Sequence, residues 1–470
     1  MSVHRISFIE AGATGLHVFS KFPVARVGTV LLSTILKEKG YEVKAFIEDV
    51  STPDWKFIES SDRVCISTLT STAIRAYSIG QRLKAKGISV IMGGAHPTFM
   101  PGEALQYSDF VVRGEGDFTL PELMSYLDNS TPAIETIQGL SYRDKTGKFF
   151  HNPDRPLLKE EELDSLPVPD FSLVHNWTPS HLYSVSTSRG CPFACKFCSV
   201  IHIFGRQYRF KSTGSVLKEL KHVRSVSKGT RFFVDDNFTA NRKRTKELLR
   251  VMIAEKLTSS WTAQVRTDAA ADPELLRLLA DAGCRTVYIG FESINPQTLE
   301  QYNKKQTVED IVRSIRALRD HGIHIHGMFV IGADADTVDV IKRTVDFAIH
   351  NGIDTVQLMV LTPLPGTPLF KEMKESGRLL HTDWGKYDAH HAVFRPSLMS
   401  AQTLQTETLK EMGRFYSWKY IMKHLAKLDL YYAGIGLFGK KTVNKTLKQI
   451  TVYRDKVSSY NPDNAEIHAE

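Results

Sequence analysis

Three cysteines lie close together in the segment Ser188-Arg-Gly-Cys191-Pro-Phe-Ala-Cys195-Lys-Phe-Cys198. Their spacing is C-x3-C-x2-C. In a chain with 5 cysteines among 470 residues, chance would produce this spacing roughly 10⁻³ times. A short loop that carries three thiolates can converge on one metal centre, and a [4Fe–4S] cluster normally takes four cysteine ligands. Three cysteines would therefore leave one iron open to another ligand.

A zinc site is the alternative interpretation of these cysteines. Closed structural zinc needs four ligands, usually as two separated pairs, and neither Cys65 nor Cys284 has a Cys or His partner nearby in the sequence. We therefore expect these two cysteines in the core. The spacing is also not that of a secreted disulfide framework, so we expect a reducing, cytoplasmic compartment.

Two series of alternating strands and helices are expected to position these residues. In the first, strands are predicted at residues 5–9, 43–47, 63–67 and 90–92, and helices at 27–39 and 70–86. This alternation is typical of a parallel sheet with helices on both faces, a doubly wound Rossmann-like domain. Gly93-Gly94 and Gly114-Glu115-Gly116 follow predicted strands, so they lie at the ligand-binding edge of such a sheet.

The second series begins shortly before the cysteines. Strands are predicted at residues 182–187, 232–235, 262–265, 287–291, 326–331 and 355–361. Six such units make a partial (β/α)6 barrel, whose chemistry should lie at the carboxyl ends of the strands. The fold class is thus α/β, with a Rossmann-like domain at 1–127, a linker with a hairpin at 128–180, the barrel at 181–375 and a mostly helical extension at 376–470.

The cysteine motif after the first barrel strand resembles the radical S-adenosylmethionine (SAM) superfamily. The resemblance covers at least residues 182–370 and implies that the open iron chelates SAM and that one electron cleaves it to a 5′-deoxyadenosyl radical. Further positions match the family in order along the barrel. They are Phe197 beside the adenine, Asp235, Asp236 and Asn237 at the SAM amino group, Arg266 at its carboxylate, Glu292 at the ribose, and Gly327 and Gly332 beside the adenine.

The domain ahead of the barrel is similar to the cobalamin-binding class of that superfamily. The resemblance rests on Gly93-Gly94-Ala-His96 and Gly114-Glu115-Gly116, and it implies a corrinoid across the sheet edge that passes a methyl group to a substrate radical. Axial-ligand domains use D-x-H-x-x-G, whereas the nearest segment here, around His17, lacks both the aspartate and the glycine. This departure puts the coordination mode in doubt rather than binding itself.

The formal charge of +8 is concentrated near the C-terminus. Residues 410–456 hold 11 Lys and Arg and 3 acids, so the rest of the chain is neutral. This argues against a general nucleic-acid binder. Residues 415–432 interleave aromatic, aliphatic and lysine side chains, as in an interfacial amphipathic helix. We expect either peripheral contact with a membrane, hence a lipid or isoprenoid substrate, or a tail packed on the barrel with a solvated lysine face.

A polar and aromatic cluster follows the sixth barrel strand and could shape the substrate pocket or pack under a loop. Its members are Trp384, Tyr387, Asp388, His390, His391 and Phe394. No run of about 18 uncharged apolar residues is present, so the sequence predicts no membrane span.

The leading hypothesis is methylation of an unactivated carbon of a small-molecule or lipid substrate, with SAM as radical source and methyl donor and with a flavodoxin or ferredoxin as electron donor. One alternative ends in cyclisation, rearrangement or carbon–carbon coupling. Another is a non-catalytic iron–sulfur sensor, which would have no use for the barrel motifs. Methylthio transfer to RNA would want three more cysteines for a second cluster, and only two remain.

Overall fold

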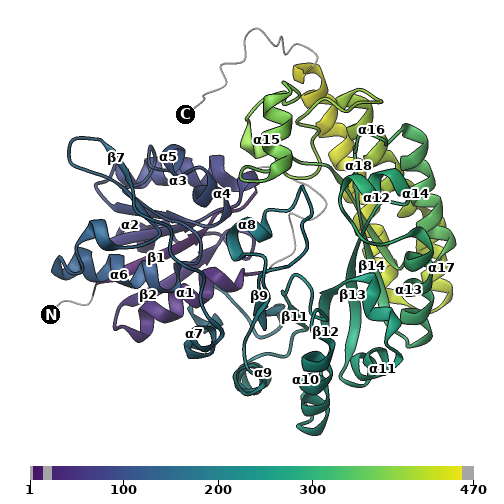
Figure 1. Cartoon of the computed structure of the whole chain (residues 1–470), viewed down its shortest axis with the longest axis horizontal. Helices are drawn as coiled ribbons and strands as arrows, with labels where there is room; N and C mark the ends of the chain where they lie inside the picture. The colour runs from purple at the N-terminus through teal and green to yellow at the C-terminus, as the bar shows by residue number, and fades with distance from the viewer. Residues whose placement is uncertain (1–3, 14–23, 458–470) are drawn as a thin grey trace.

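The computed structural model describes residues 4–13 and 24–457. Two α/β halves lie side by side, and a group of C-terminal helices covers the outer side of the second half (Figure 1). His17, the candidate axial ligand, falls outside the described residues. Along the described chain, no helix is both long enough and apolar enough to cross a membrane.

The first half is built on a seven-stranded sheet of order β2-β1-β3-β4-β5-β6-β7. Its strands are β1 (Arg5–Glu10), β2 (Glu42–Ile47), β3 (Arg63–Ser67), β4 (Ser89–Gly93), β5 (Phe110–Val112), β6 (Leu140–Arg143) and β7 (Phe149–His151). Its helices are α1 (Val27–Glu38), α2 (Trp55–Glu59), α3 (Ala73–Lys84), α4 (Ala95–Phe99), α5 (Pro101–Ala104) and α6 (Gly116–Asn129). β1 to β5 pair in parallel, which confirms the predicted Rossmann-like architecture.

The hairpin expected within the linker extends this first sheet. β6 pairs antiparallel with β5, and β7 pairs antiparallel with β6. Leu140 and Ser141 are fully buried, so the hairpin covers an edge that would otherwise present unpaired backbone groups. A linker starting at residue 128 therefore begins too early, because sequence periodicity does not show which sheet a short hairpin joins.

The second half is an open barrel of six parallel strands, in the order β15-β14-β13-β12-β11-β8. The strands are β8 (Tyr183–Val185), β11 (Arg231–Phe233), β12 (Trp261–Val265), β13 (Cys284–Glu292), β14 (His324–Ile331) and β15 (Thr355–Val360). The helices between them are α9 (Thr213–Val226), α10 (Arg242–Ala254), α11 (Pro273–Asp281), α12 (Pro296–Gln301), α13 (Val308–Asp320) and α14 (Val338–His350), and α15 (Pro368–Glu375) follows β15. The predicted six-unit barrel is confirmed.

A small two-stranded unit lies between β8 and β11. It consists of β9 (Ser188–Arg189) and β10 (Arg209–Phe210), which pair antiparallel around α8 (Val200–Phe204). α7 (Glu160–Ser165) precedes the barrel in the connecting segment. This unit carries the three-cysteine segment between the barrel and the first half.

Three helices end the described chain: α16 (Ala401–Phe415), α17 (Trp418–Ala426) and α18 (Leu430–Val457). α16 runs antiparallel to the barrel strands, because its start packs near Gly332 at the end of β14 while Tyr416, just after it, bonds the backbone of Val356 near the start of β15. Residues 415–432, expected to form one interfacial helix, therefore extend over the end of α16, all of α17 and the start of α18.

The polar and aromatic cluster after β15 packs between the halves. Trp384 is 4% exposed, its indole nitrogen donates to Glu103 at 2.8 Å, and its ring meets His96 edge-on at 5.1 Å. Glu103 and His96 belong to the first half. Of the two roles expected for the cluster, packing is the one that Trp384 performs.

The barrel core depends on large side chains at the strand starts. Trp261 in β12 is fully buried, meets Phe233 edge-on at 5.1 Å, and donates its indole hydrogen to the carbonyl of Ala282. We predict that Trp261→Ala lowers the free energy of unfolding by about 3–5 kcal/mol, because it leaves a cavity in close-packed surroundings. Chemical denaturation measures this, with Leu398→Ala, at a side chain 57% exposed, as a control that should change stability by at most ~0.5 kcal/mol.

Candidate functional site

The cysteines occupy a loop, residues 190–198, that leaves β9 at the carboxyl end of the barrel and is called here the cluster loop. Gly190 starts it with φ +91°, and a Cβ there would lie 2.2 Å from the carbonyl oxygen of Gln207, so glycine is required. The amide of Cys191 donates to the carbonyl of Gly205 at 3.2 Å. The loop therefore departs from a fixed point on the β9–β10 unit.

The thiols of the cluster loop are electrostatically coupled. Burial raises the pKa of Cys198 to about 12, and the Asp236 carboxylate and the two other sulfurs also raise it. Burial likewise raises the pKa of Cys195, which Lys304 partly offsets. Thiolates in such surroundings need a strong positive charge, which bound iron supplies, since ligation deprotonates a thiol outright.

The donor set fits a cluster that is held by three cysteines. Within the described chain, no three His, Cys, Asp or Glu side chains converge closely enough to hold a single metal ion, but a four-iron cluster is wider than one ion and its ligands stand further apart. Cys65 and Cys284 are buried in β3 and β13, as expected for core residues.

The acidic segment after β11 has divided roles. Asp235 is 2% exposed and accepts hydrogen bonds from the amide and hydroxyl of Thr187 and the hydroxyl of Ser188, so it anchors the strand that leads into the cluster loop. Asn237 is 3% exposed and caps the turn at Thr239. Of the three polar residues 235–237, Asp236 is thus the one that is exposed and could accept a hydrogen bond from a ligand.

Part of Asp236 reaches solvent, but protein atoms surround most of its carboxyl group. Desolvation and the charge of Asp235 raise its pKa to about 7. A cationic ligand group beside Asp236 would favour its ionised form, which fits the expected contact with the SAM amino group.

Arg266 follows β12 and lies against the cluster loop. Its guanidinium sits 3.7 Å from the ring centroid of Phe193, an attractive cation–π geometry. Its Nε is buried and has no hydrogen-bond partner in the structure. A buried, unpartnered donor costs free energy, so this nitrogen suits an anionic group such as the SAM carboxylate.

Phe197 packs under the loop that follows α12. Its ring meets Tyr302 edge-on at 5.0 Å, and the Tyr302 hydroxyl is buried without a partner. The next residue, Asn303, donates to the carbonyl of Ala194 at 3.4 Å. This loop therefore braces the cluster loop, a role that the sequence did not indicate.

Glu292 ends β13 in an unusual backbone conformation. Its φ is +62°, the register with β14 shifts between Gly290 and Glu292, and its carboxylate accepts from Lys304 at 2.8 Å. A Cβ at Gly290 would lie 2.3 Å from that carboxylate, so glycine makes room for it. Both ends of the Glu292–Lys304 pair are buried.

The glycines of β14 are explained by packing within the described chain. A Cβ at Gly327 would come within 3.2 Å of Ile353 and Phe291, and one at Gly332, where φ is +114°, would lie 2.8 Å from Leu404 of α16. Their expected place beside the adenine stays a prediction.

The residues expected to contact the corrinoid at the sheet edge differ in how accessible they are to a ligand. The backbone of Gly94 is exposed and that of Gly93 and Gly114 is half-buried, and a Cβ at Gly114 would have nothing within 4 Å. His96 is fully buried and bonds Tyr77 and Thr70, so it presents no surface to a ligand.

Two further residues of this edge are committed to packing. A Cβ at Gly116 would lie 3.2 Å from Val112 and 3.5 Å from Leu32. Glu115 is 5% exposed and pairs with arginines of the other half. Open glycine backbone at the sheet edge is the observation that fits a bulky planar ligand.

The arginine clamp, formed by Glu115, Asp117, Arg189 and Arg209, joins the halves. Glu115 accepts from Arg209 at 2.8 and 3.0 Å and from Arg189 at 3.0 Å, and Asp117 accepts from Arg189 at 2.8 and 3.0 Å. Burial alone would raise the pKa of Asp117, but the charge and hydrogen bonds of Arg189 outweigh it and lower the pKa. The clamp therefore ties α6 directly to the residue that precedes the cluster loop.

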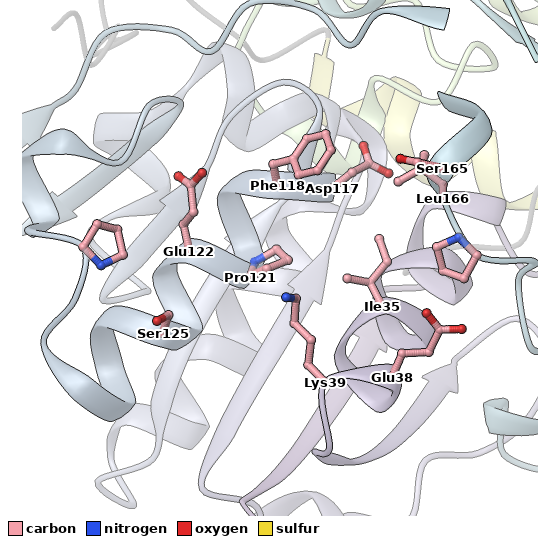
Figure 2. Close-up of a pocket in the computed structure, with 12 residues that line it drawn as sticks. Ile35, Glu38, Lys39, Asp117, Phe118, Pro121, Glu122, Ser125, Ser165 and Leu166 are labelled. Carbon is pink, nitrogen blue, oxygen red and sulfur yellow. The ribbon is translucent and has the colours of Figure 1, made fainter. Parts of the chain in front are cut away.

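The structure also contains a pocket of about 520 Å³ on the first half. It lies between α1 and α6, with Ile35 and Lys39 on one side and Phe118 and Glu122 on the other (Figure 2). None of the residues predicted from the sequence lines it, and it is separate from the cluster loop.

Sequence reasoning missed the residues that position the cysteines. Arg189 and Arg209 occupy paired positions of β9 and β10, and the Tyr208 hydroxyl lies 3.9 Å from the Cys191 sulfur. Arginines and acidic residues occur widely on protein surfaces. The sequence therefore gives no signal that these two arginines and two acids form a buried clamp and are not exposed to solvent.

Comparisons with known proteins agree with this geometry. The family model of the Radical SAM superfamily matches residues 185–348, and that of the B12 binding domain matches residues 18–124. Bacteriochlorophyllide d C-12(1)-methyltransferase of Chlorobaculum tepidum is 32% identical over 77% of this chain and 76% of its own. An uncharacterized methyltransferase of Pyrococcus horikoshii is 32% identical over 83% of this chain and 87% of its own.

The fold has a solved counterpart. The radical SAM methyltransferase TsrM from Kitasatospora setae, solved with cobalamin and a [4Fe–4S] cluster, has a TM-score of 0.71 over 94% of this chain and 100% of its own, at 18% identity. The chain belongs to the cobalamin-binding class of the radical SAM superfamily. It is an enzyme of the cobalamin-dependent radical SAM methyltransferase type, with a [4Fe–4S] cluster, SAM and cobalamin as cofactors.

Removal of one cluster ligand tests the cysteine assignment. We predict that Cys195→Ala, reconstituted anaerobically, loses the iron–sulfur absorption band and most of its iron and sulfide, because two thiolates do not retain a cuboidal cluster. Cys284→Ala is the matched control, since that thiol is buried in β13, and it should keep wild-type iron content. Equal iron in wild type and Cys195→Ala would contradict the assignment.

Breaking the clamp tests its contribution to stability. Glu115→Gln leaves two buried guanidiniums with one carboxylate fewer, so we predict a loss of roughly 3–5 kcal/mol in the free energy of unfolding. Glu59→Gln is the control, because Glu59 pairs with the exposed Arg82, and such pairs contribute about 0–1 kcal/mol. Urea denaturation of both variants, followed by circular dichroism, gives the comparison, and equal losses would contradict a special role for the clamp.

Proposed function

We propose that this enzyme methylates an unactivated carbon of a hydrophobic small molecule, with its substrate held between the cluster loop and the glycine-lined edge of the first sheet. The observation that carries the proposal is the arginine clamp, which fixes the start of α6 to Arg189, immediately ahead of the cluster loop. Both cofactor regions therefore belong to one site.

The residues have separate tasks in this proposal. Asp236 receives the amino group of SAM and Arg266 its carboxylate, while Cys191, Cys195 and Cys198 hold the cluster. When bound, the cluster and SAM supply the radical that removes a hydrogen atom, and cobalamin supplies the methyl group. The buried donor of Arg266 and the raised pKa of Asp236 support these placements.

The substrate class is supported by kinship. One relative is named for methyl transfer to bacteriochlorophyllide d and another as a hopanoid methylase, and these names support a hydrophobic substrate here. The electron donor in this proposal is a small acidic protein such as a flavodoxin or ferredoxin. The basic C-terminal segment is proposed to contact a membrane surface peripherally.

Product analysis without the natural substrate tests the chemistry. We predict that anaerobic enzyme with cobalamin, SAM and dithionite forms both 5′-deoxyadenosine and S-adenosylhomocysteine, the products of the two uses of SAM. Cys195→Ala should lose the first. 5′-Deoxyadenosine without S-adenosylhomocysteine, together with no retained cobalt, would overturn methyl transfer and favour cyclisation or coupling. Absence of 5′-deoxyadenosine would overturn the radical step.

A further inference from the structure

Large exposed apolar side chains are concentrated on one face of the C-terminal helices, which we call the α17–α18 face. It carries eight of the fourteen exposed large hydrophobic residues of the described chain. They are Trp418, Met422, Leu425, Leu428, Leu430, Tyr431, Leu437 and Phe438, with exposed fractions from 40% at Leu425 to 87% at Leu428. Exposed apolar side chains concentrated in this way are typical of an interaction site.

The same face is strongly basic. Six lysines are exposed there: Lys419, Lys423, Lys427, Lys441, Lys445 and Lys448. Lys440 adds its ammonium group 5.7 Å from the centroid of the Trp418 ring. The one acid between residues 416 and 448 is Asp429, and its carboxylate is bonded to His424 and to the amide of Tyr432.

The inner side of these helices is already packed. The Tyr420 hydroxyl donates to the carbonyl of Asp354 at 2.6 Å, and the Tyr432 ring lies 4.8 Å from the ring of His324. Both contacts are with residues that precede or begin strands of the barrel. The exposed apolar side chains are therefore surplus to the packing of the barrel.

Position in the fold separates this face from the reaction site. α17 and the start of α18 pack on the amino ends of β13 to β15, whereas the cluster loop lies beyond the carboxyl ends of the strands. The eight residues of β14 alone span roughly 26 Å. An acidic electron donor on α17 or the start of α18 would therefore stand at the wrong end of the barrel to reduce the cluster.

Charge also decides against a second copy of the chain. A symmetric dimer through this face would bring its six exposed lysines against the same six, with no free carboxylates to offset them. A surface that combines inserted apolar side chains with lysines fits anionic lipid headgroups over an acyl layer.

We propose that the α17–α18 face docks on an anionic bilayer and that the enzyme sits there with its barrel mouth directed away from the lipid. This deepens the membrane contact proposed above and does not depend on the methyl-transfer chemistry. In this orientation the substrate reaches the site from the aqueous side and does not enter the barrel directly from the bilayer.

Vesicle flotation of the full chain tests the docking. We expect the wild type to float with phosphatidylserine–phosphatidylcholine vesicles and not with phosphatidylcholine alone. Lys419→Glu combined with Lys423→Glu and Lys427→Glu should reduce the bound fraction at least tenfold. Lys39→Glu combined with Lys145→Glu and Lys374→Glu, exposed lysines on other surfaces, should bind as the wild type does. Absence of flotation, or equal loss in both triple variants, overturns the proposal.

Tryptophan quenching by brominated lipid tests the orientation. Trp418 is 60% exposed, whereas Trp261 and Trp384 are buried and Trp55 and Trp177, on other surfaces, are half-buried, so Trp418→Phe should abolish most of the quenching. In that background, Lys371→Trp places an indole at an exposed position of α15, next to the cluster loop through the bond from Leu369 to Lys196, and should remain unquenched. Quenching of the indole at position 371 overturns the orientation. If light scattering shows a dimer of the wild type and a monomer of the Lys419, Lys423 and Lys427 triple variant, the face belongs to a contact with a second copy and the docking is overturned.

Discussion

The arginine clamp is the interaction on which the arrangement of this enzyme depends. Isolated buried charges are costly, and each clamp residue is acceptable only because its partners come from the other half of the molecule. Glu115 immediately precedes α6, and Arg189 immediately precedes the cluster loop. Separation of the halves would leave four charges without their partners at the same time. One hydrogen-bonded network therefore fixes the position of the two cofactor regions relative to each other.

The rest of the site is arranged around that fixed loop. Asp235 holds the approach to it from β11, Arg266 stacks on Phe193 from the end of β12, and the segment after α12 braces it through Asn303. Two buried polar groups that have no hydrogen-bond partner in the described chain, the Arg266 Nε and the Tyr302 hydroxyl, lie in this same region. Packed residues thus immobilise the loop, while the polar groups that can meet a ligand stay available.

The two ends of the barrel have different tasks. Its carboxyl ends hold the cluster loop and face the first half, whereas its amino ends are covered by α17 and the start of α18. Basic and apolar side chains gather at the second end, well away from the chemistry. A segment that by sequence resembles one amphipathic helix is divided by tertiary packing into inward side chains, such as Tyr420 and Tyr432, and outward lysines.

The sequence by itself determined the alternation of strands and helices in both halves and the cysteine motif, because parallel strands buried on both faces leave a strong apolar signal and the cysteine spacing is improbable by chance. Only the tertiary structure decided that the hairpin at β6 and β7 belongs to the first sheet, that His96 and Glu115 are buried in contacts instead of open to a ligand, and that Asp236 is the exposed acid of its segment. These outcomes depend on where a side chain points and on which distant charge meets it. Periodicity along one chain encodes burial and not the identity of a partner dozens of residues away.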